Sequence, residues 1–347
     1  MVIPAISVLL PIRNGERFLG SALESIVSQS FTDLEIICID DGSSDATPEM
    51  LRAFQERDTR IRVITLEGKG LVNALNIGLA EARSSFVARM DADDIAMPKR
   101  LESQYAHMIQ NDDLLVLGTR TLWINEEGIE LKPPRFVKGR QEVAKALECK
   151  CVICHPTVLM RRIPIMEMGG YRCAYECAED FDLWLRASER GSIDNLDFVG
   201  LKYRIHAANV GATRLVQQQI STALAIATHK LRIGGKADPT DGLSKAPDIG
   251  SAQFLGSLIP GELRFFQLVD FLLRDNFEYS RAKLLVDGQD PEILVKHAKL
   301  WHWVLTRLAL AAPLADTNKW RLLARALALH PGRTVKALRR VNRGYRP

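Results

Sequence analysis

The sequence predicts an α/β protein with a mostly parallel sheet flanked by helices, followed by a helical appendage. Three observations lead to this prediction. Short β-type runs alternate with helical patterns through the first 120 residues, and polar residues gather where each predicted strand ends. Beyond about residue 211 the pattern becomes helical and more basic. We therefore expect two domains: residues 1–210 with the sheet, and residues 211–347, which are mainly helical.

Five segments of the first domain are predicted to be strands, because each is short, apolar and bounded by turn residues. In chain order they are 6–10 (ISVLL), 34–39 (LEIICI), 61–65 (IRVIT), 85–89 (SFVAR) and 114–118 (LLVLG). Helical patterns follow the first four, near 15–28, 45–57, 71–82 and 98–110. Strands and helices that alternate at this spacing form βαβ units, with helices on both faces of a parallel sheet.

The section from residue 121 to residue 209 gives a less regular pattern. Residues 121–131 (TLWINEEGIEL) predict a hairpin, and residues 179–191 (EDFDLWLRASERG) predict a helix. A strand is expected just before His206.

Composition is that of an ordinary globular protein, with 47% hydrophobic and 25% charged residues, and it points to no partner. The charge, however, is uneven. From Ala315 onward there are nine Lys or Arg and one acid, about +8, whereas the whole chain has a formal net charge of +4. The remainder is therefore acidic. The start lacks a basic n-region, and no run approaches eighteen uncharged apolar residues, so we expect a cytoplasmic protein.

Five of the six cysteines lie between residues 149 and 177, close to His155. Such a cluster is compatible with a structural zinc site, but it lacks the paired C-x2-C spacing that makes a zinc prediction specific. Incidental reduced thiols are the alternative, and the cytoplasmic prediction favours them.

Residues that could bind a ligand or take part in a reaction follow the predicted strands. Arg13 and Asn14 follow the first strand, Asp40 ends the second, and Gly70 follows the third. Because ligands of parallel sheets bind outside the carboxyl ends of the strands, we expect a ligand site at this edge.

The strongest signal is residues 89–94 (RMDADD), which place Asp91, Asp93 and Asp94 directly after the fourth strand. Carboxylates this close repel one another, so a cationic partner is expected. Two of them, separated by the small Ala92, can face one hard cation, Mn²⁺ or Mg²⁺, and leave room for diphosphate oxygens. The alternative is a solvated turn that caps the next helix, for which one Asp would suffice.

Three other residues have two interpretations each. Asp40 can accept hydrogen bonds from a base or a sugar; the alternative is a turn without a ligand, in which Asp45 caps the next helix and Gly42 permits the bend, and it leaves Asp40 without a role. Asp180 lies beside an apolar stripe, either as a first-turn carboxylate or as a general base in a partly dry site. His206 is structural unless it can reach the metal.

Taken together, these segments resemble the family-two inverting glycosyltransferases with the GT-A fold. The resemblance rests on 11–47 (PIRNGERF to SSDAT), 70–82 (GLVNALNIGLAEA), 88–104 (ARMDADDIAMPKRLESQ), 155–162 (HPTVLMRR), 169–172 (GGYR) and 178–186 (AEDFDLWLR). It covers about residues 4–208 and does not extend over the C-terminal third. It implies a Rossmann-like sheet and the transfer of a sugar from a nucleoside-diphosphate sugar, UDP being favoured, to an acceptor hydroxyl.

The resemblance also implies roles for the matching residues. Asp40 would pair with the nucleotide base, and Asp91 would lie near the ribose and the metal. Asp93 would coordinate the divalent cation, with His206 as a further ligand, and Asp180 would be the general base. The other donor-binding residues that it implies are Pro11, Arg13, Asn14, Glu16, Gly70 and Ala92.

Three features depart from the pattern of the family. Arg13 stands where many members have a Tyr that stacks on the base, although a guanidinium can stack as well. Gly68 replaces a common Asn. The QxxRW signature of processive synthases is missing, so we expect single-sugar transfer to a saccharide or lipid-linked acceptor, in the synthesis of a cell-envelope polysaccharide or glycoconjugate.

Two other functions remain open. A metal-dependent nucleotidyltransferase would need a Gly-rich, basic triphosphate loop near the first strand, and residues 11–18 (PIRNGERF) offer little of this. A non-catalytic nucleotide-binding or scaffold protein of the same fold would use the basic tail for interactions. That tail is either a solvated helix or a surface helix that contacts the inner face of the cytoplasmic membrane. Nucleic acid is not expected, because aromatic residues are sparse in the tail.

Overall fold

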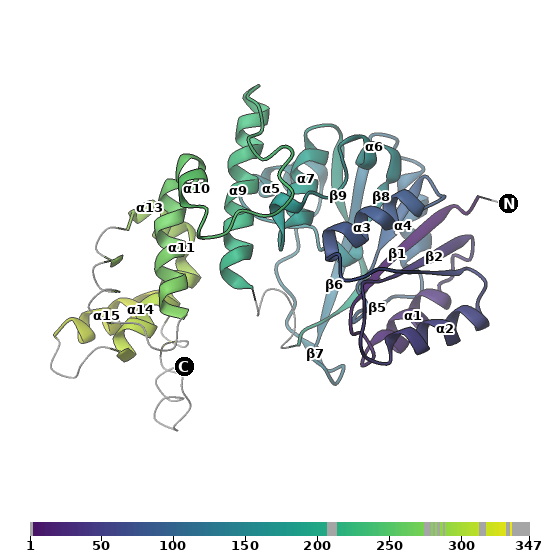
Figure 1. The fold of residues 1–347 in the computed structure, drawn as a ribbon, viewed down its shortest axis with the longest axis horizontal. Helices are drawn as coiled ribbons and strands as arrows, with labels where there is room; N and C mark the ends of the chain where they lie inside the picture. The colour runs from purple at the N-terminus through teal and green to yellow at the C-terminus, as the bar shows by residue number, and fades with distance from the viewer. Residues whose placement is uncertain are drawn as a thin grey trace. The chain divides into compact units, whose positions relative to one another are not determined.

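The computed structural model describes residues 3–206, 214–273, 289–311 and 317–330, with the single residues 279, 282, 285, 286 and 334. The chain divides into two compact units, Met1–Ala246 and Pro247–Pro347. The first contains the sheet, and the second is helical in its described part (Figure 1).

Nine strands form one sheet in the first unit. They are β1 (Ile6–Ile12), β2 (Leu34–Asp40), β3 (Ile61–Thr65), β4 (Phe86–Arg89), β5 (Ile95–Ala96), β6 (Leu114–Ile124), β7 (Glu130–Leu131), β8 (Leu159–Arg161) and β9 (Ser192–Arg204). The helices of this unit are α1 (Leu19–Val27), α2 (Thr47–Arg57), α3 (Leu71–Glu81), α4 (Arg100–Met108), α5 (Arg140–Leu147), α6 (Arg162–Glu167), α7 (Glu179–Ser188) and α9 (Leu215–Ile233), with 3₁₀ turns η1 (His155–Thr157) and η2 (Cys173–Tyr175).

The strand order is β3-β2-β1-β4-β8-β6-β9-β5, with β7 paired to β6. The predicted α/β class is confirmed, and the four strands β3, β2, β1 and β4 are parallel neighbours. Beyond β4 the sheet is mixed, because β8 runs antiparallel to both β4 and β6, whereas β6 and β9 are parallel. The predicted strand 114–118 and the first strand of the predicted hairpin are one continuous strand, β6, which pairs with β7.

Strand β1 is buried along its whole length because helices cover both of its faces. Alternate residues Val8 and Leu10 join the core under α1, α2 and α4. On the other face, the Leu9 side chain contacts Gly78 of α3, where an added Cβ would lie 3.2 Å from it. Figure 1 shows α3 on one side of β1 and β2, and α1 and α2 on the other.

The parallel register brings the carboxyl ends of β1, β2 and β4 to one edge. Ile12, the last residue of β1, pairs with Asp40, the last of β2. Arg89, the last residue of β4, pairs with Leu9 of β1. The loops that the sequence marked as chemically active therefore converge on the same edge of the sheet.

Helix α9 belongs to the first unit, although the sequence analysis assigned residues from 211 onward to the C-terminal region. The hydroxyl of Tyr175, in η2, lies 2.8 Å from the Thr228 hydroxyl of α9 and 2.7 Å from that of Thr240. These buried contacts fix α9 and the segment after it to the body of the first unit, which continues to Ala246.

A buried ion network anchors α7, the helix that begins with Glu179. The Asp182 carboxylate is fully buried and accepts hydrogen bonds of 3.0 Å from Nε of Arg172 and of Arg186. Arg172 extends the network, because its Nη1 donates to Asp238 at 3.0 Å and to Asp241 at 2.8 Å. The network joins α7 to the segment that follows α9.

The second unit contains α10 (Ala252–Leu258), α11 (Pro260–Leu273), α13 (Pro291–Lys296), α14 (Ala298–Ala311) and α15 (Thr317–Leu329). Its core includes Phe265, Phe266 and Leu268 of α11, together with Trp301 and Leu305 of α14. Within the described ranges no helix is both long and apolar enough to cross a membrane. Most of the basic tail, residues 331–333 and 335–347, lies outside the described residues, so its membrane contact stays a prediction.

Replacing Asp182 by Ala should destabilise the first unit by about 3–5 kcal/mol, because it leaves two buried guanidinium groups without their shared carboxylate. Urea denaturation followed by tryptophan fluorescence measures the change. The matched control is Asp241→Ala, which removes an exposed partner of Arg172 and should cost less than about 1 kcal/mol. Equal losses for the two variants would contradict the proposed importance of the buried network.

Candidate active site

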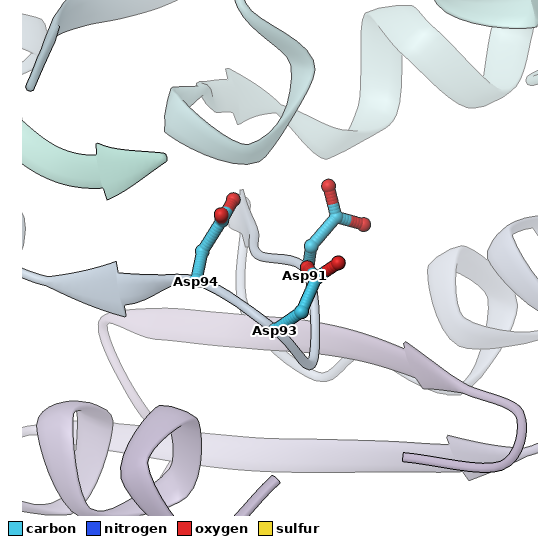
Figure 2. A group of neighbouring side chains, drawn as sticks. All are labelled: Asp91, Asp93 and Asp94. Carbon is cyan, nitrogen blue, oxygen red and sulfur yellow. The ribbon is translucent and has the colours of Figure 1, made fainter. Parts of the chain in front are cut away.

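The acidic turn, Asp91 to Asp94, follows β4 at the carboxyl edge of the sheet. Carboxylate oxygens of Asp91, Asp93 and Asp94 lie within 4.8 Å of one another. Figure 2 shows Asp91 and Asp93 beside each other on the turn, with Asp94 to one side. Three negative charges at this separation need cations nearby, and the structure supplies several from different elements.

Arg89 is the cation beneath Asp91. Its side chain is buried, and both of its terminal nitrogens bind the Asp91 carboxylate, with Nη1 2.6 Å from Oδ2. Such a two-pronged pair fixes both the position and the orientation of the carboxylate. Within the described part of the chain, Nε of Arg89 has no hydrogen-bond partner.

Arg204, the last residue of β9, holds the other end of the acidic turn. Its backbone N–H donates to Oδ1 of Asp94 at 2.8 Å, and its Nε donates to the Asp93 carbonyl at 2.8 Å. The guanidinium also stacks over the Phe18 ring, 4.5 Å from its centroid. Burial raises the pKa of Asp94 well above its usual range, and the charges of Asp91 and Asp93 raise it further.

His206 stands two residues beyond β9 and reaches Asp93. Its Nε2 lies 2.7 Å from Oδ2 of Asp93, and its ring packs against that of Phe18, 5.5 Å between centroids. The structure thus brings together two residues that are 113 positions apart in sequence.

These residues fit a divalent cation. Asp91 and Asp93 offer carboxylate oxygens and His206 offers an imidazole nitrogen, a donor set suited to Mn²⁺ or Mg²⁺. Oδ2 of Asp94 is buried, and none of the described residues donates a hydrogen bond to it. The cysteines, by contrast, are all free thiols and, across the described ranges, form no comparable ligand group.

A cavity of about 600 Å³ opens over the acidic turn. Five of the residues predicted from the sequence line it: Gly70, Asp91, Asp93, Asp180 and His206. The volume suits a ligand of the size of a nucleotide sugar.

The predicted residues of the β1–α1 turn lie outside this lining. Pro11 is buried within β1. Asn14 and Glu16 bind the β2–α2 turn: Oδ1 of Asn14 accepts from Ser44 N at 2.9 Å, and Oε2 of Glu16 accepts from Ala46 N at 3.1 Å. Arg13 reaches across to the β3–α3 loop, where an added Cβ on Gly68 would lie 3.9 Å from its guanidinium.

Asp40 and its neighbour Asp41 stabilise loops at the same edge. Asp40 is buried and accepts from Ser43 N at 3.0 Å. Asp41 accepts from the backbone nitrogens of Lys69 and Gly70 at 2.6 and 2.8 Å, which ties β2 to the cavity wall. Gly42 allows this approach, because it has a φ of 74° and an added Cβ would lie 3.0 Å from Gly68 N.

Asp180 lies in the first turn of α7 and faces the cavity beside Glu179. One of its oxygens accepts from Phe181 N at 2.7 Å. Burial raises the pKa of Asp180 to about 6, and it raises the pKa of Glu179 to about 7, with the Asp180 charge adding to the effect on Glu179. With a pKa of about 6, the Asp180 carboxylate is mostly ionised at neutral pH and basic enough to take a proton.

Several cavity residues were not predicted from the sequence. Arg89 was not predicted because the sequence pattern does not distinguish a buried arginine from an exposed one. Glu176, Arg214 and Lys245 were missed because η2, α9 and the segment after α9 lie far from the strand ends in sequence. The Glu-Asp dipeptide before Phe181 was a usable signal for Glu179.

Comparison with known proteins gives consistent results. A sequence model of glycosyl transferase family 2 matches residues 7–168. The O-antigen biosynthesis glycosyltransferase WbnJ of Escherichia coli is 35% identical over 209 residues, which cover 59% of this chain and 81% of the relative.

Two solved structures share the fold at 17% identity. TarS residues 1–349 of S. aureus, in complex with UDP-GlcNAc, has a TM-score of 0.56 and aligns over 98% of this chain and 92% of that one. The mannosyltransferase PcManGT of Pyrobaculum calidifontis, in complex with GDP-Man and Mn²⁺, has a TM-score of 0.54 and aligns over 98% and 87%.

Replacing Arg89 by Lys should destabilise the protein by about 1–3 kcal/mol, because a lysine ammonium cannot bind both oxygens of Asp91 in the buried position. Urea denaturation measures the loss. The control is Arg83→Lys, since the Arg83 side chain is 43% exposed and pairs with Glu35 at 3.7 Å; we expect a change within about 0.5 kcal/mol. An Arg89→Lys variant as stable as this control would contradict the role given to the pair.

Proposed function

Because this chain belongs to glycosyl transferase family 2, we propose that it moves a single sugar from a UDP-linked donor to an acceptor hydroxyl, with inversion at the anomeric carbon. The observation that carries the proposal is that one cavity contains both the acidic turn and Asp180. A donor diphosphate and an acceptor hydroxyl need a cation site and a base within reach of the same anomeric carbon.

We propose that Asp93 and His206 hold a divalent cation, Mn²⁺ or Mg²⁺, with Asp91 beside it. When bound, such an ion stabilises the charge that develops on the departing diphosphate. The structural neighbour solved with Mn²⁺ supports this assignment. Arg89 holds the Asp91 carboxylate in place. At the other end of the turn, Arg204 binds the Asp93 carbonyl through Nε and the Asp94 carboxylate through its backbone N–H.

Asp180 is the proposed general base. The hydrogen bond from Phe181 N orients one oxygen of its carboxylate, and the cavity is lined by this side chain. The carboxylate accepts the proton of the acceptor hydroxyl while that oxygen attacks the anomeric carbon on the face opposite the diphosphate. Attack from that face inverts the configuration.

The donor is proposed to lie along the carboxyl edge of β1 to β4. Gly70 and Asp91 both line the cavity, and Arg13 and Asp40 lie at the ends of β1 and β2, where the nucleotide base would be placed. This edge is proposed to be shaped by Pro11, Asn14, Glu16 and Ala92. Ala92 lies close to the β1–α1 turn, since an added Cβ on Gly15 would lie 3.8 Å from the Ala92 side chain. The neighbour solved with UDP-GlcNAc supports UDP as the nucleotide.

The acceptor is proposed to be a saccharide or lipid-linked saccharide of a cell-envelope polysaccharide. The name of the relative WbnJ, which places it in O-antigen biosynthesis, supports this pathway. A non-catalytic nucleotide-binding protein of the same fold is the alternative, and it would not need a base in the cavity.

Asp93→Ala should weaken metal-dependent nucleotide binding, because it removes the carboxylate that lies against His206. Calorimetric titration of UDP, GDP, dTDP and CDP, with and without Mn²⁺, measures it. We expect UDP to bind only with the metal, and the variant to lose at least about tenfold in affinity. Asp112→Ala, which alters a fully solvated carboxylate, should bind like the wild type. Unchanged UDP binding by Asp93→Ala would rule out the proposed metal site.

The pH dependence of transfer should report the ionisation of Asp180. Asp180 can act as a base only when its carboxyl group is deprotonated. The value of kcat/KM should therefore fall about tenfold per pH unit below about pH 6 and level off above it. Asp180→Asn should lower kcat by about 10²–10⁴ and leave the Kd for UDP unchanged. A variant that keeps wild-type kcat would assign the base to another group, and a wild-type profile that is flat through pH 6 would do the same.

A further inference from the structure

The cavity continues past the proposed donor site to a second wall. This wall, the α9 wall, consists of Glu176, Arg214, Gln218, Ser244 and Lys245. It is built from η2–α7, α9 and the segment after α9, all of them beyond residue 168, where the family match ends. In Figure 1, α9 lies beyond α7 as seen from the parallel strands.

The α9 wall is fixed by specific contacts. The Ser221 hydroxyl of α9 donates to the Glu176 carbonyl at 2.8 Å, and the Arg214 guanidinium pairs with the Glu176 carboxylate. Tyr175, the residue before Glu176, binds hydroxyls of Thr228 and Thr240. The wall is therefore held to the same short segment that leads into Asp180, so its position relative to the base is fixed.

Charge separates the two ends of the cavity. Asp91 and Asp93 line the sheet side together with Lys69 and Arg89. Glu179 and Asp180 line the middle, and the α9 wall contains one acid, Glu176. Arg214 and Lys245 are the cations of the α9 wall. Nη1 of Arg214 pairs with the Glu176 carboxylate, and the guanidinium has five N–H donors in all, so others can bind a ligand. The Lys245 side chain is exposed.

We propose that the α9 wall is the acceptor subsite and that it takes a saccharide carrying a phosphate or diphosphate. This rests on the proposed function, since Asp180 must face the acceptor hydroxyl. A saccharide seated on the wall presents a hydroxyl to Asp180 and its anionic group to Arg214 and Lys245. An arginine fork and a lysine ammonium match phosphate oxygens, whereas in the rest of the cavity lining four carboxylates outnumber two cations, Lys69 and Arg89.

Calorimetry on the full chain loaded with UDP and Mn²⁺ tests this, with two probes: butyl-diphosphate N-acetylglucosamine and the neutral butyl N-acetylglucosaminide. We expect the diphosphate to bind at least about tenfold more tightly. Arg214→Gln and Lys245→Gln should each weaken its binding about fivefold or more, with no change for the neutral probe. Both side chains are solvent-accessible, and the far-UV circular dichroism spectrum of each variant verifies its fold.

The control is Lys230→Gln, an exposed lysine of the same helix that is not part of the cavity lining; it should bind both probes like the wild type. Equal affinity for the two probes, or binding of neither, would overturn the inference while UDP binding stays intact. A raised Kd for UDP in Arg214→Gln would also overturn it, because the cation would then serve the donor. If the wild type binds no nucleotide, the proposed function fails and the inference falls with it.

Discussion

The structure of the site depends on how three carboxylates are kept together on one turn. Their mutual repulsion is compensated from two sides: Arg89 lies beneath Asp91, and Arg204 and His206 approach Asp93 and Asp94 from β9. Strand β9 is therefore as much a part of the site as β4, although the two strands are distant in sequence. The mixed half of the sheet, in which β9 lies between β6 and β5, is what brings Arg204 and His206 to the acidic turn.

Helix α7 serves two purposes with residues two positions apart. Asp180 faces the cavity, whereas Asp182 is buried in an ion network with Arg172 and Arg186. The network extends to Asp238, beyond α9. The position of Asp180 is thus linked to the packing of α9, which lies outside the region of family resemblance.

The order of strands and helices could be predicted where periodicity and turn residues agree, as they do from β1 to β4. The acidic turn and the partnership of Asp93 with His206 followed from residue type and resemblance. Periodicity could not predict that β8 runs antiparallel between β4 and β6, because a three-residue strand carries almost no pattern. Nor could it show that α9 packs against η2, because Thr228 and Thr240 bind Tyr175 through tertiary contacts that no local signal encodes.

The pairing of Arg204 with Asp94 also has a consequence for biosynthesis. The two residues are 110 positions apart, and contacts of that separation close late because a long loop must be ordered first. At ordinary rates of translation, the acidic turn emerges on the order of ten seconds before β9. During that interval Arg89 already faces the acidic turn, next to a nearly complete parallel sheet, but the contacts that β9 supplies are still missing.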